Sequence, residues 1–216
     1  MRFVGLTALL LGLLAWSAHA QYDPPPAESD PDAEVDANGN AFVPDSLNFD
    51  PATVRVPVGG VVRWTNTDQF VPHTSTEDHG LWRLSGSYGS PGPYQGYGPE
   101  ESVERAFEAG THNYYCEVHP EDMRAVVEVP VTLRKTGRRR AAAVWSKSAP
   151  AEGLVFDVER RRNGRAWRTL LDGTTERRAT FRLGPKRTRS RLRARLRSAE
   201  DEAKATDWSP VASIRR

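Results

Sequence analysis

The chain has 216 residues, of which 30 are lysine or arginine, 28 are aspartate or glutamate, and 38% are hydrophobic. A chain of this length can form one or two domains with buried cores. Its single cysteine excludes an intramolecular disulfide, and its single long apolar run excludes a protein with several membrane-spanning helices.

The first 20 residues have the pattern of an export signal. Arg2 supplies a positive charge, residues 3–16 form an apolar run, and Ala18-His19-Ala20 supplies small residues at a cleavage position. A membrane anchor is the alternative, but the run is short for a span. We therefore expect a signal peptide over 1–20, a mature chain that begins near Gln21, and a periplasmic or secreted location.

Charge divides the remaining chain into two regions. Residues 21–134 carry 19 acidic and 6 basic residues, a net charge of −13, whereas residues 135–216 carry 9 acidic and 23 basic residues, a net charge of +14. The acidic, proline-rich segment 21–34 cannot bury a core, so it is predicted to be a disordered tail. The sign changes at the basic segment 135–140, which we interpret as a linker between two domains.

Alternating and β-branched residues predict strands in the middle of the chain. Valines alternate over 54–58, an apolar segment at 61–65 follows the Gly59-Gly60 turn, and 125–131 is rich in β-branched residues. No window of adequate length has a helical period. Residues 80–99 contain six Gly, three Pro and three Tyr. A loop of that length is usually a functional or mobile surface feature.

A thiolate, an imidazole and a thioether occur together within eight residues, as Cys116, His119 and Met123. His73 would add a second imidazole from a separate loop. Two His, one Cys and a weak Met ligand suit both Cu(I) and Cu(II), so electron transfer requires little rearrangement. The sequence therefore predicts one copper ion bound by His73, Cys116, His119 and Met123.

Other interpretations of the same residues are open. Cys116 and His119 could be the nucleophile and base of a thiol hydrolase, or the group could bind zinc, although structural zinc sites usually contain more thiolates. Met123 could be an ordinary core residue and His73 an ordinary loop residue. Glu121 could replace Met123 as the axial ligand, which would lower the reduction potential.

Two further histidines are not expected among the ligands. His112 lies four residues before Cys116 in a predicted strand, roughly 13 Å away at the rise of an extended chain. His79 begins the glycine-rich segment, where we expect it to be solvated, with a secondary metal contact as the alternative.

The region 35–134 resembles the cupredoxins, the plastocyanin-like blue-copper family. The resemblance rests on segments that follow the order of that family: Phe42-Val43-Pro44, Val54 to Gly59, Val62 to Asp68, His73-Thr74, and the loop from Tyr114 to Met123. It implies an all-β fold, a two-sheet Greek-key sandwich with copper at one end.

The region 141–216 is predicted to form a second β domain. It resembles a fibronectin type III domain in a series of residues: Trp145, Phe156-Asp157-Val158, Trp167, Gly173-Thr174-Thr175, Phe181, and Asp207-Trp208-Ser209-Pro210. The tyrosine that this family carries early in its penultimate strand is Leu192 here.

Arginines alternate with apolar residues over 191–197, which predicts a strand with one apolar and one basic face. In a fibronectin-like sheet this strand lies beside the one that carries Asp157 and Glu159, so cross-strand pairing should neutralise part of the basic face. Nucleic acid is not an expected partner outside the cell. Anionic envelope polymer, membrane headgroups or an acidic protein could bind there, and a solvated surface or contact with the acidic first domain are the alternatives.

These expectations describe an exported type 1 copper protein that carries single electrons and is not an enzyme. A protein that sequesters or delivers copper, and an adhesion-type module with structural copper, are the alternatives. Carboxylates of Glu117, Glu121 and Asp122 are expected near the mouth of the copper site. Their negative field would steer a redox partner with a basic surface toward the metal.

Overall fold

The structure is a computed structural model that describes residues 30–39, 47–89 and 95–216. The predicted signal peptide over 1–20 lies outside these residues, as does most of the predicted acidic tail. Contacts divide the chain into Met1–Asp30 and Pro31–Arg216. Within the described ranges every regular element is a β-strand, which confirms the all-β prediction. No helix in those ranges is long and apolar enough to cross a membrane.

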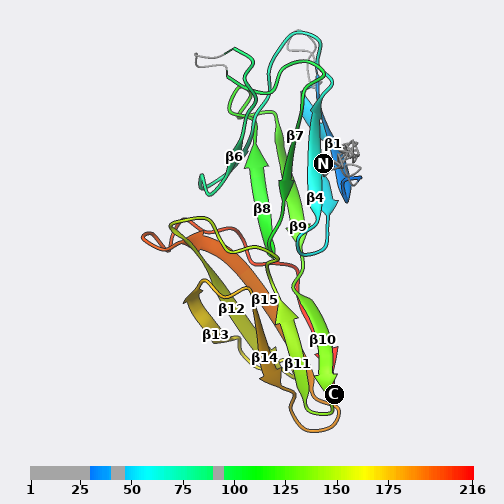
Figure 1. Ribbon diagram of the computed structural model, residues 1–216, viewed down its shortest axis with the longest axis vertical. Helices are drawn as coiled ribbons and strands as arrows, with labels where there is room; N and C mark the ends of the chain where they lie inside the picture. The colour runs from blue at the N-terminus through cyan, green and yellow to red at the C-terminus, as the bar shows by residue number, and fades with distance from the viewer. Residues whose placement is uncertain (1–29, 40–46, 90–94) are drawn as a thin grey trace, which may run out of the picture. The chain divides into compact units, whose positions relative to one another are not determined.

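Two sheets form the N-terminal β region, which we define as β1 to β9 (Figure 1). One sheet has the order β2-β1-β4-β7, with strands β1 Ala33–Asn38, β2 Asn48–Asp50, β4 Val61–Asn66 and β7 Ser102–Ala106. The other has the order β3-β9-β8-β5-β6, with strands β3 Thr53–Arg55, β5 Ser75–Glu77, β6 Arg83–Leu84, β8 Gly110–Tyr115 and β9 Arg124–Val129. Pairs β1/β4 and β3/β9 are parallel, and the other pairs are antiparallel.

Side-chain alternation builds the core between these sheets. Val62 and Trp64 of β4 are fully buried, and so are Val127 and Val129 of β9, whereas the residues between them are partly exposed. Because successive side chains of a strand point to opposite faces, each sheet supplies one apolar face to the core. The predicted strands at 61–65 and 125–131 are therefore confirmed, with slightly different ends.

Two further sheets form the C-terminal β region, which we define as β10 to β16 (Figure 1). Their orders are β10-β11-β14 and β13-β12-β15-β16. The strands are β10 Thr132–Gly137, β11 Arg140–Val144, β12 Leu154–Arg162, β13 Arg168–Thr174, β14 Arg178–Arg182, β15 Arg189–Ser198 and β16 Ala212–Arg215. Both sheets contribute buried residues, such as Ala141 and Phe181 from one and Phe156 and Leu196 from the other.

The first strand begins earlier than the predicted end of the acidic tail at residue 34. Ala33 is already part of β1 and pairs with Val62 of β4. The Oδ2 atom of Asp32 accepts a hydrogen bond of 2.9 Å from the backbone N–H of Val61. An acidic residue of the predicted tail is thus used as a hydrogen-bond acceptor at the start of β4, which composition alone does not reveal.

The segment 135–140, predicted to be a linker, lies in a β-hairpin. Strands β10 and β11 pair from Thr132↔Val144 to Gly137↔Arg140, so the basic residues Arg138 and Arg139 form the turn. Leu133 of β10 packs on the core, whereas the charged residues after it are exposed. Dense positive charge here marks the solvent-exposed end of a hairpin whose buried positions, Ala141 and Ala143, lie on the partner strand β11.

The arginine-rich strand near the C-terminus forms as predicted. Its cationic side chains pair with carboxylates of the neighbouring strand β12: Arg193 lies 2.6 Å from Glu159, and Arg195 and Arg197 lie 2.9 and 3.0 Å from Asp157. The predicted cross-strand pairing is therefore confirmed, and this part of the basic face is neutralised.

Candidate metal centre

Two segments that are far apart in sequence bring the predicted donor residues together. His73 precedes β5, and its backbone N–H and C=O exchange hydrogen bonds of 3.1 and 2.8 Å with Tyr97. Cys116 directly follows β8. Backbone pairing with Tyr97 therefore fixes the His73 segment, and the end of β8 fixes Cys116, without any contribution from an ion.

Backbone hydrogen bonds close the loop from Cys116 to Met123. The N–H of Cys116 donates to the carbonyl of Met123 at 3.0 Å, and the N–H of His119 donates to the carbonyl of Cys116 at 3.1 Å. The N–H of Met123 donates to the carbonyl of His119 at 3.0 Å. The three residues that carry sulfur or imidazole donors are therefore held by one another's backbone groups.

The donor atoms of His73, Cys116 and His119 converge. The Sγ atom of Cys116 lies 3.7 Å from Nδ1 of His73 and 3.8 Å from Nδ1 of His119, and the donors of the group all lie within 4.8 Å of one another. Two donors that each lie about 2 Å from a common ion have separations of this size at trigonal or tetrahedral angles. The three side chains therefore fit one metal ion.

The two candidates for the axial position differ in burial. Met123 is fully buried, whereas Glu121 is exposed. A thioether in a dry position at the end of the ligand loop is a suitable weak donor, and an exposed carboxylate is already solvated by water. Burial therefore favours Met123 over Glu121.

Hydrogen bonds reach the sulfur and join the two ligand segments. The backbone N–H of Thr74 points at Sγ of Cys116 at 3.4 Å, and the hydroxyl of Thr74 accepts a bond of 2.8 Å from the N–H of Glu117. Thr74 therefore contacts the donor sulfur directly and keeps the His73 segment in register with the Cys116 loop.

Both imidazoles are suited to bind metal in their neutral form. Burial, followed by the nearby His119 imidazole, lowers the pKa of His73 to about 4, although Asp68 opposes this shift. Burial also lowers the pKa of His119. A neutral imidazole is the form that coordinates a metal, so neither ligand has to lose a proton at neutral pH.

A buried carboxylate lies behind His73. The side chain of Asp68 is 2% exposed, and its Oδ2 atom lies 3.7 Å from Nε2 of His73. Neither of these two atoms has a hydrogen-bond partner among the described residues. A metal-bound imidazole usually donates its second N–H to such a group, which fixes the orientation of the ring.

Asn66 holds the loop that carries Asp68. Its Oδ1 atom accepts a bond of 2.8 Å from the N–H of Asp68, and its side-chain amide donates to the carbonyls of Val71 and Tyr97 at 2.9 and 3.0 Å. The sequence pattern alone does not single out Asn66 or Asp68 for a role at the site. The signal in the sequence is a carboxylate five residues before a histidine ligand and two residues after the end of a strand.

Part of the glycine-rich segment 80–99 supports His73. Tyr97 is fully buried, and its hydroxyl shares a hydrogen bond of 3.1 Å with Ser75. A Cβ atom added to Gly96 would lie 2.3 Å from the backbone oxygen of His73. Gly96 is therefore required for the close approach of the two backbones.

The other two histidines of the described residues have partners of their own. His112 is fully buried, with Nδ1 accepting a bond of 3.3 Å from the indole of Trp82 and Nε2 lying 3.0 Å from the carbonyl of Glu108. His79 lies 3.3 Å from the carboxylate of Glu77. Neither belongs to the cluster of donors, as the sequence predicts.

The carboxylates expected at the mouth of the site are not equivalent. Arg83 lies 2.9 Å from Glu117, and its hydrogen bonds lower the pKa of that carboxyl. The charge of Glu117 is therefore largely offset, which corrects the expectation that it contributes to a negative field. Glu121 and Asp122 are exposed.

No protein-family model matches the chain, and no curated protein matches it. Among solved structures, a purple cupredoxin from Nitrosopumilus maritimus is 32% identical, with 45% of this chain and 99% of that chain covered and a TM-score of 0.35. An amicyanin variant in its Cu(I) form is 27% identical, with 47% and 84% covered and a TM-score of 0.32. Pseudoazurin from Hyphomicrobium denitrificans is 22% identical, with 45% and 73% covered and a TM-score of 0.33. These neighbours are cupredoxins, and they cover about 45% of the chain.

Proposed function

We propose that this chain is an exported type 1 copper protein of the cupredoxin family that carries single electrons between redox partners. The observation that supports this most strongly is the convergence of one thiolate and two imidazoles from two separately fixed segments. In this proposal His73, Cys116 and His119 bind the ion, and Met123 is the weak axial ligand.

The chain's own groups determine how such a site works. Bound copper would supply a one-electron couple. The hydrogen bonds from Thr74 and within the loop from Cys116 to Met123 keep the donors in place in both oxidation states. Cys116 and His73 are fully buried, so water is kept from these two ligands, whereas His119 is half-buried. A site that is already organised needs little rearrangement when the electron moves.

The alternatives fit the geometry less well. A hydrolase nucleophile must reach its substrate, but Cys116 is fully buried. A structural zinc site would be expected to offer more than one thiolate, and Cys116 is the single cysteine of the chain. Copper sequestration or delivery would use the same ligands, so it is the second candidate function. The experiment described below distinguishes it from electron transfer.

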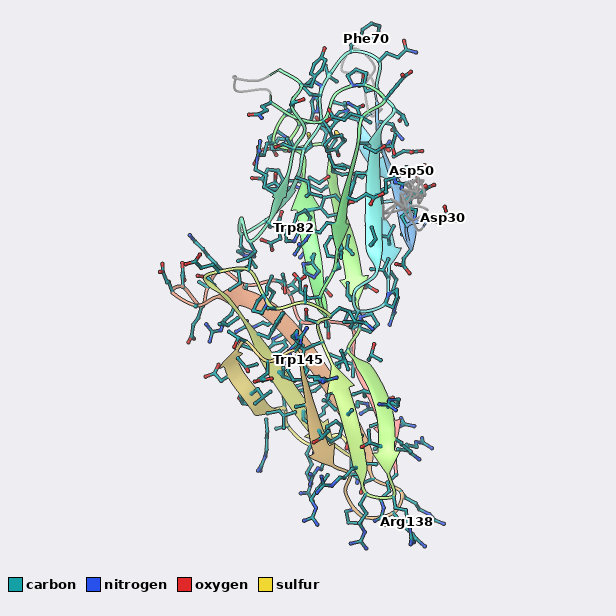
Figure 2. All side chains as sticks on the ribbon, viewed as in Figure 1. Asp30, Asp50, Phe70, Trp82, Arg138 and Trp145 are labelled. Atoms are coloured by element: carbon teal, nitrogen blue, oxygen red, sulfur yellow. The ribbon has the colours of Figure 1, made fainter. Side chains whose placement is uncertain are left out.

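The partner we propose is a redox protein with a basic surface. Phe70 is 66% exposed on the segment that links β4 to His73 (Figure 2). Glu121 and Asp122 are exposed on the loop that carries His119. The exposed aromatic ring offers apolar contact and the exposed carboxylates offer long-range attraction, and the attraction should weaken as the salt concentration rises.

The C-terminal β region is proposed to be fibronectin type III-like. Its strand orders, β10-β11-β14 and β13-β12-β15-β16, support this together with the sequence resemblance. An export address, based on the predicted signal peptide over 1–20, is part of the same proposal.

The deciding experiment is the visible spectrum and reduction potential of the copper-loaded protein. We expect an intense thiolate-to-Cu(II) band, a reversible one-electron potential, and loss of the band in Cys116→Ser. Binding of Cu(I) without a stable Cu(II) form would instead support sequestration. An intense band that survives in Cys116→Ser would rule out this cysteine as the ligand.

A further inference from the structure

Several turns and the chain end meet at one end of the C-terminal β region. The β10–β11 turn reaches the β14–β15 segment, where the N–H of Leu183 donates to the carbonyl of Arg139 at 2.8 Å. The β12–β13 turn reaches β15, where the N–H of Asn163 donates to the carbonyl of Arg189 at 3.0 Å. The side chain of Arg216 contacts the carbonyl of Arg138 at 3.3 Å.

These turns carry a dense set of cations, which we call the basic tip. Nitrogen-ended side chains gather there around Arg138 (Figure 2). All of its members are exposed except the half-buried Arg216. The basic tip consists of Arg138, Arg139, Arg140, Arg162, Arg165, Arg182, Lys186, Arg187, Arg215 and Arg216.

The basic tip differs from the rest of this region because its charges are not neutralised. Segments 134–151, 160–171, 177–199 and 208–216 contain no aspartate or glutamate. Arg193, Arg195 and Arg197 of β15 pair with Asp157 and Glu159, whereas no member of the basic tip pairs with a carboxylate or stacks on an aromatic ring within the described ranges. The exposed charges thus remain available to a partner.

Hollows in the surface lie between these cations. One, of about 400 Å³, is lined by residues 137–140, and another, of about 370 Å³, is lined by Arg187, Arg189 and Arg215 among others. A third, of about 300 Å³, is lined by five arginines between 160 and 168, of which Arg162 and Arg165 belong to the basic tip. Guanidinium groups therefore surround several separate depressions.

One arginine of the third hollow is buried without a counter-charge. Arg160 is 9% exposed; its Nη2 atom donates to the carbonyl of Arg182 and the hydroxyl of Ser190 at 2.8 Å, and its guanidinium group lies 4.4 Å from the ring centroid of Phe181. Its Nε atom has no hydrogen-bond partner, and no carboxylate pairs with it within the described residues. Burial and the neighbouring Arg162 lower its pKa to about 10. A buried charge is costly unless an opposite charge is near. An anion in this hollow would supply that charge.

We propose that the basic tip binds a linear, flexible polymer of phosphate groups. The basic tip is almost entirely arginine, whose planar fork matches phosphate oxygens. Runs such as Arg138-Arg139-Arg140 crowd several guanidinium groups together, and one phosphate offers enough oxygen atoms to accept from more than one of them. Because the hollows lie on separate turns, a chain that occupies several at once gains multivalent binding.

A membrane surface fits the basic tip less well. The large hydrophobic residues that are exposed in the described part of the chain are Phe70, Tyr88 and Val211. None belongs to the basic tip, so no apolar side chain there is placed to enter a bilayer. The binding that we infer is independent of copper and goes beyond the proposed electron transfer.

The test uses the copper-loaded protein and fluorescently labelled long-chain inorganic polyphosphate. We expect saturable binding whose affinity falls steeply between 50 and 200 mM salt, roughly as a power of salt concentration set by the phosphates contacted. Replacing Arg138, Arg139 and Arg187 with serine should weaken binding at least about tenfold. The matched control Lys147→Ser, Arg178→Ser, Lys204→Ser also removes three positive charges, but outside the basic tip. It should change the affinity for polyphosphate less than about twofold.

Folding and partner class are checked in the same experiment. The thermal midpoint and the visible spectrum of the triple variant should match those of the wild type. If the triple variant fails to fold, the double variant Arg165→Ser, Arg187→Ser takes its place in the binding experiment. Equal losses in the tip and control variants would overturn the proposal. So would tighter binding of polyglutamate, duplex DNA or phosphatidylglycerol vesicles than of polyphosphate at equal charge concentration, or an absence of binding at 50 mM salt.

Discussion

The Oδ2 atom of Asp68 lies 3.7 Å from Nε2 of His73, and both side chains are buried. The opposite nitrogen of the same ring, Nδ1, lies 3.7 Å from Sγ of Cys116. The imidazole therefore stands between a carboxylate and the candidate metal position. A negative charge behind a ligand stabilises the more highly charged metal ion, so Asp68 should favour Cu(II) over Cu(I).

We predict that Asp68→Asn raises the reduction potential, by on the order of 50–100 mV for a charge this close in a partly dry site. The amide oxygen can still accept from the imidazole N–H, so the ligand geometry should be kept while the charge is lost. Cyclic voltammetry measures the shift. Asp122→Asn is the control, because this exposed carboxylate on the ligand loop is screened by water and should shift the potential less. Equal shifts in the two variants would contradict a special role for Asp68.

Met123→Leu should keep copper bound and raise the reduction potential, on the order of tens of millivolts, because a weak donor to Cu(II) is removed. Met123 is fully buried, and leucine has a similar volume, so the loss of stability should be below about 1.5 kcal/mol. Potentials of Met123→Leu and Glu121→Gln are compared directly. A large shift in Glu121→Gln with little change in Met123→Leu would identify the carboxylate as the axial ligand.

Gly96→Ala should weaken the site through the backbone. A Cβ at this position would lie 2.3 Å from the carbonyl oxygen of His73, and neither backbone can move away cheaply. We expect a loss of about 1–3 kcal/mol in the free energy of unfolding and weaker copper binding. Denaturant titration and a copper competition assay measure the two effects. Gly137→Ala is the control, since no atom lies within 4 Å of its added Cβ; equal losses would refute the explanation.

The sequence predicts the strands of the core well, because alternation is a local property. Val62 and Trp64 alternate with partly exposed neighbours in both the sequence pattern and the structure. The cluster of His73, Cys116 and His119 could also be predicted, since few metals suit one thiolate with two imidazoles. The chemical nature of the donor side chains therefore limits the candidate metals even when the distances between the donors are not known.

Features that depend on contacts between distant segments could not be predicted in this way. Asp68 acquires its role only because the fold brings it to Nε2 of His73, and Gly96 only because its backbone pairs beside that residue. The segment 135–140 illustrates a different difficulty. Its positive charge suggested a linker, but its residues lie at exposed positions of a hairpin, which forms through the pairing of β10 with β11.

The stability of the C-terminal β region should depend on acid through Asp157. Burial alone would raise the pKa of this carboxyl, but hydrogen bonds from the backbone of Gly173 and from Arg197 and Arg195 together lower it below its ordinary value. A carboxyl with a lowered pKa in the folded state adds stability above its unfolded pKa, and this contribution is lost as pH falls through the folded pKa. We therefore expect the thermal midpoint to drop as pH falls below about 4.

In Asp157→Asn the midpoint should be lower at pH 7, because Arg197 loses its buried partner, and the drop below pH 4 should be smaller. The surface variant Asp201→Asn serves as the control. An acid-induced drop of equal size in wild type and Asp157→Asn would show that this ion pair does not set the pH dependence.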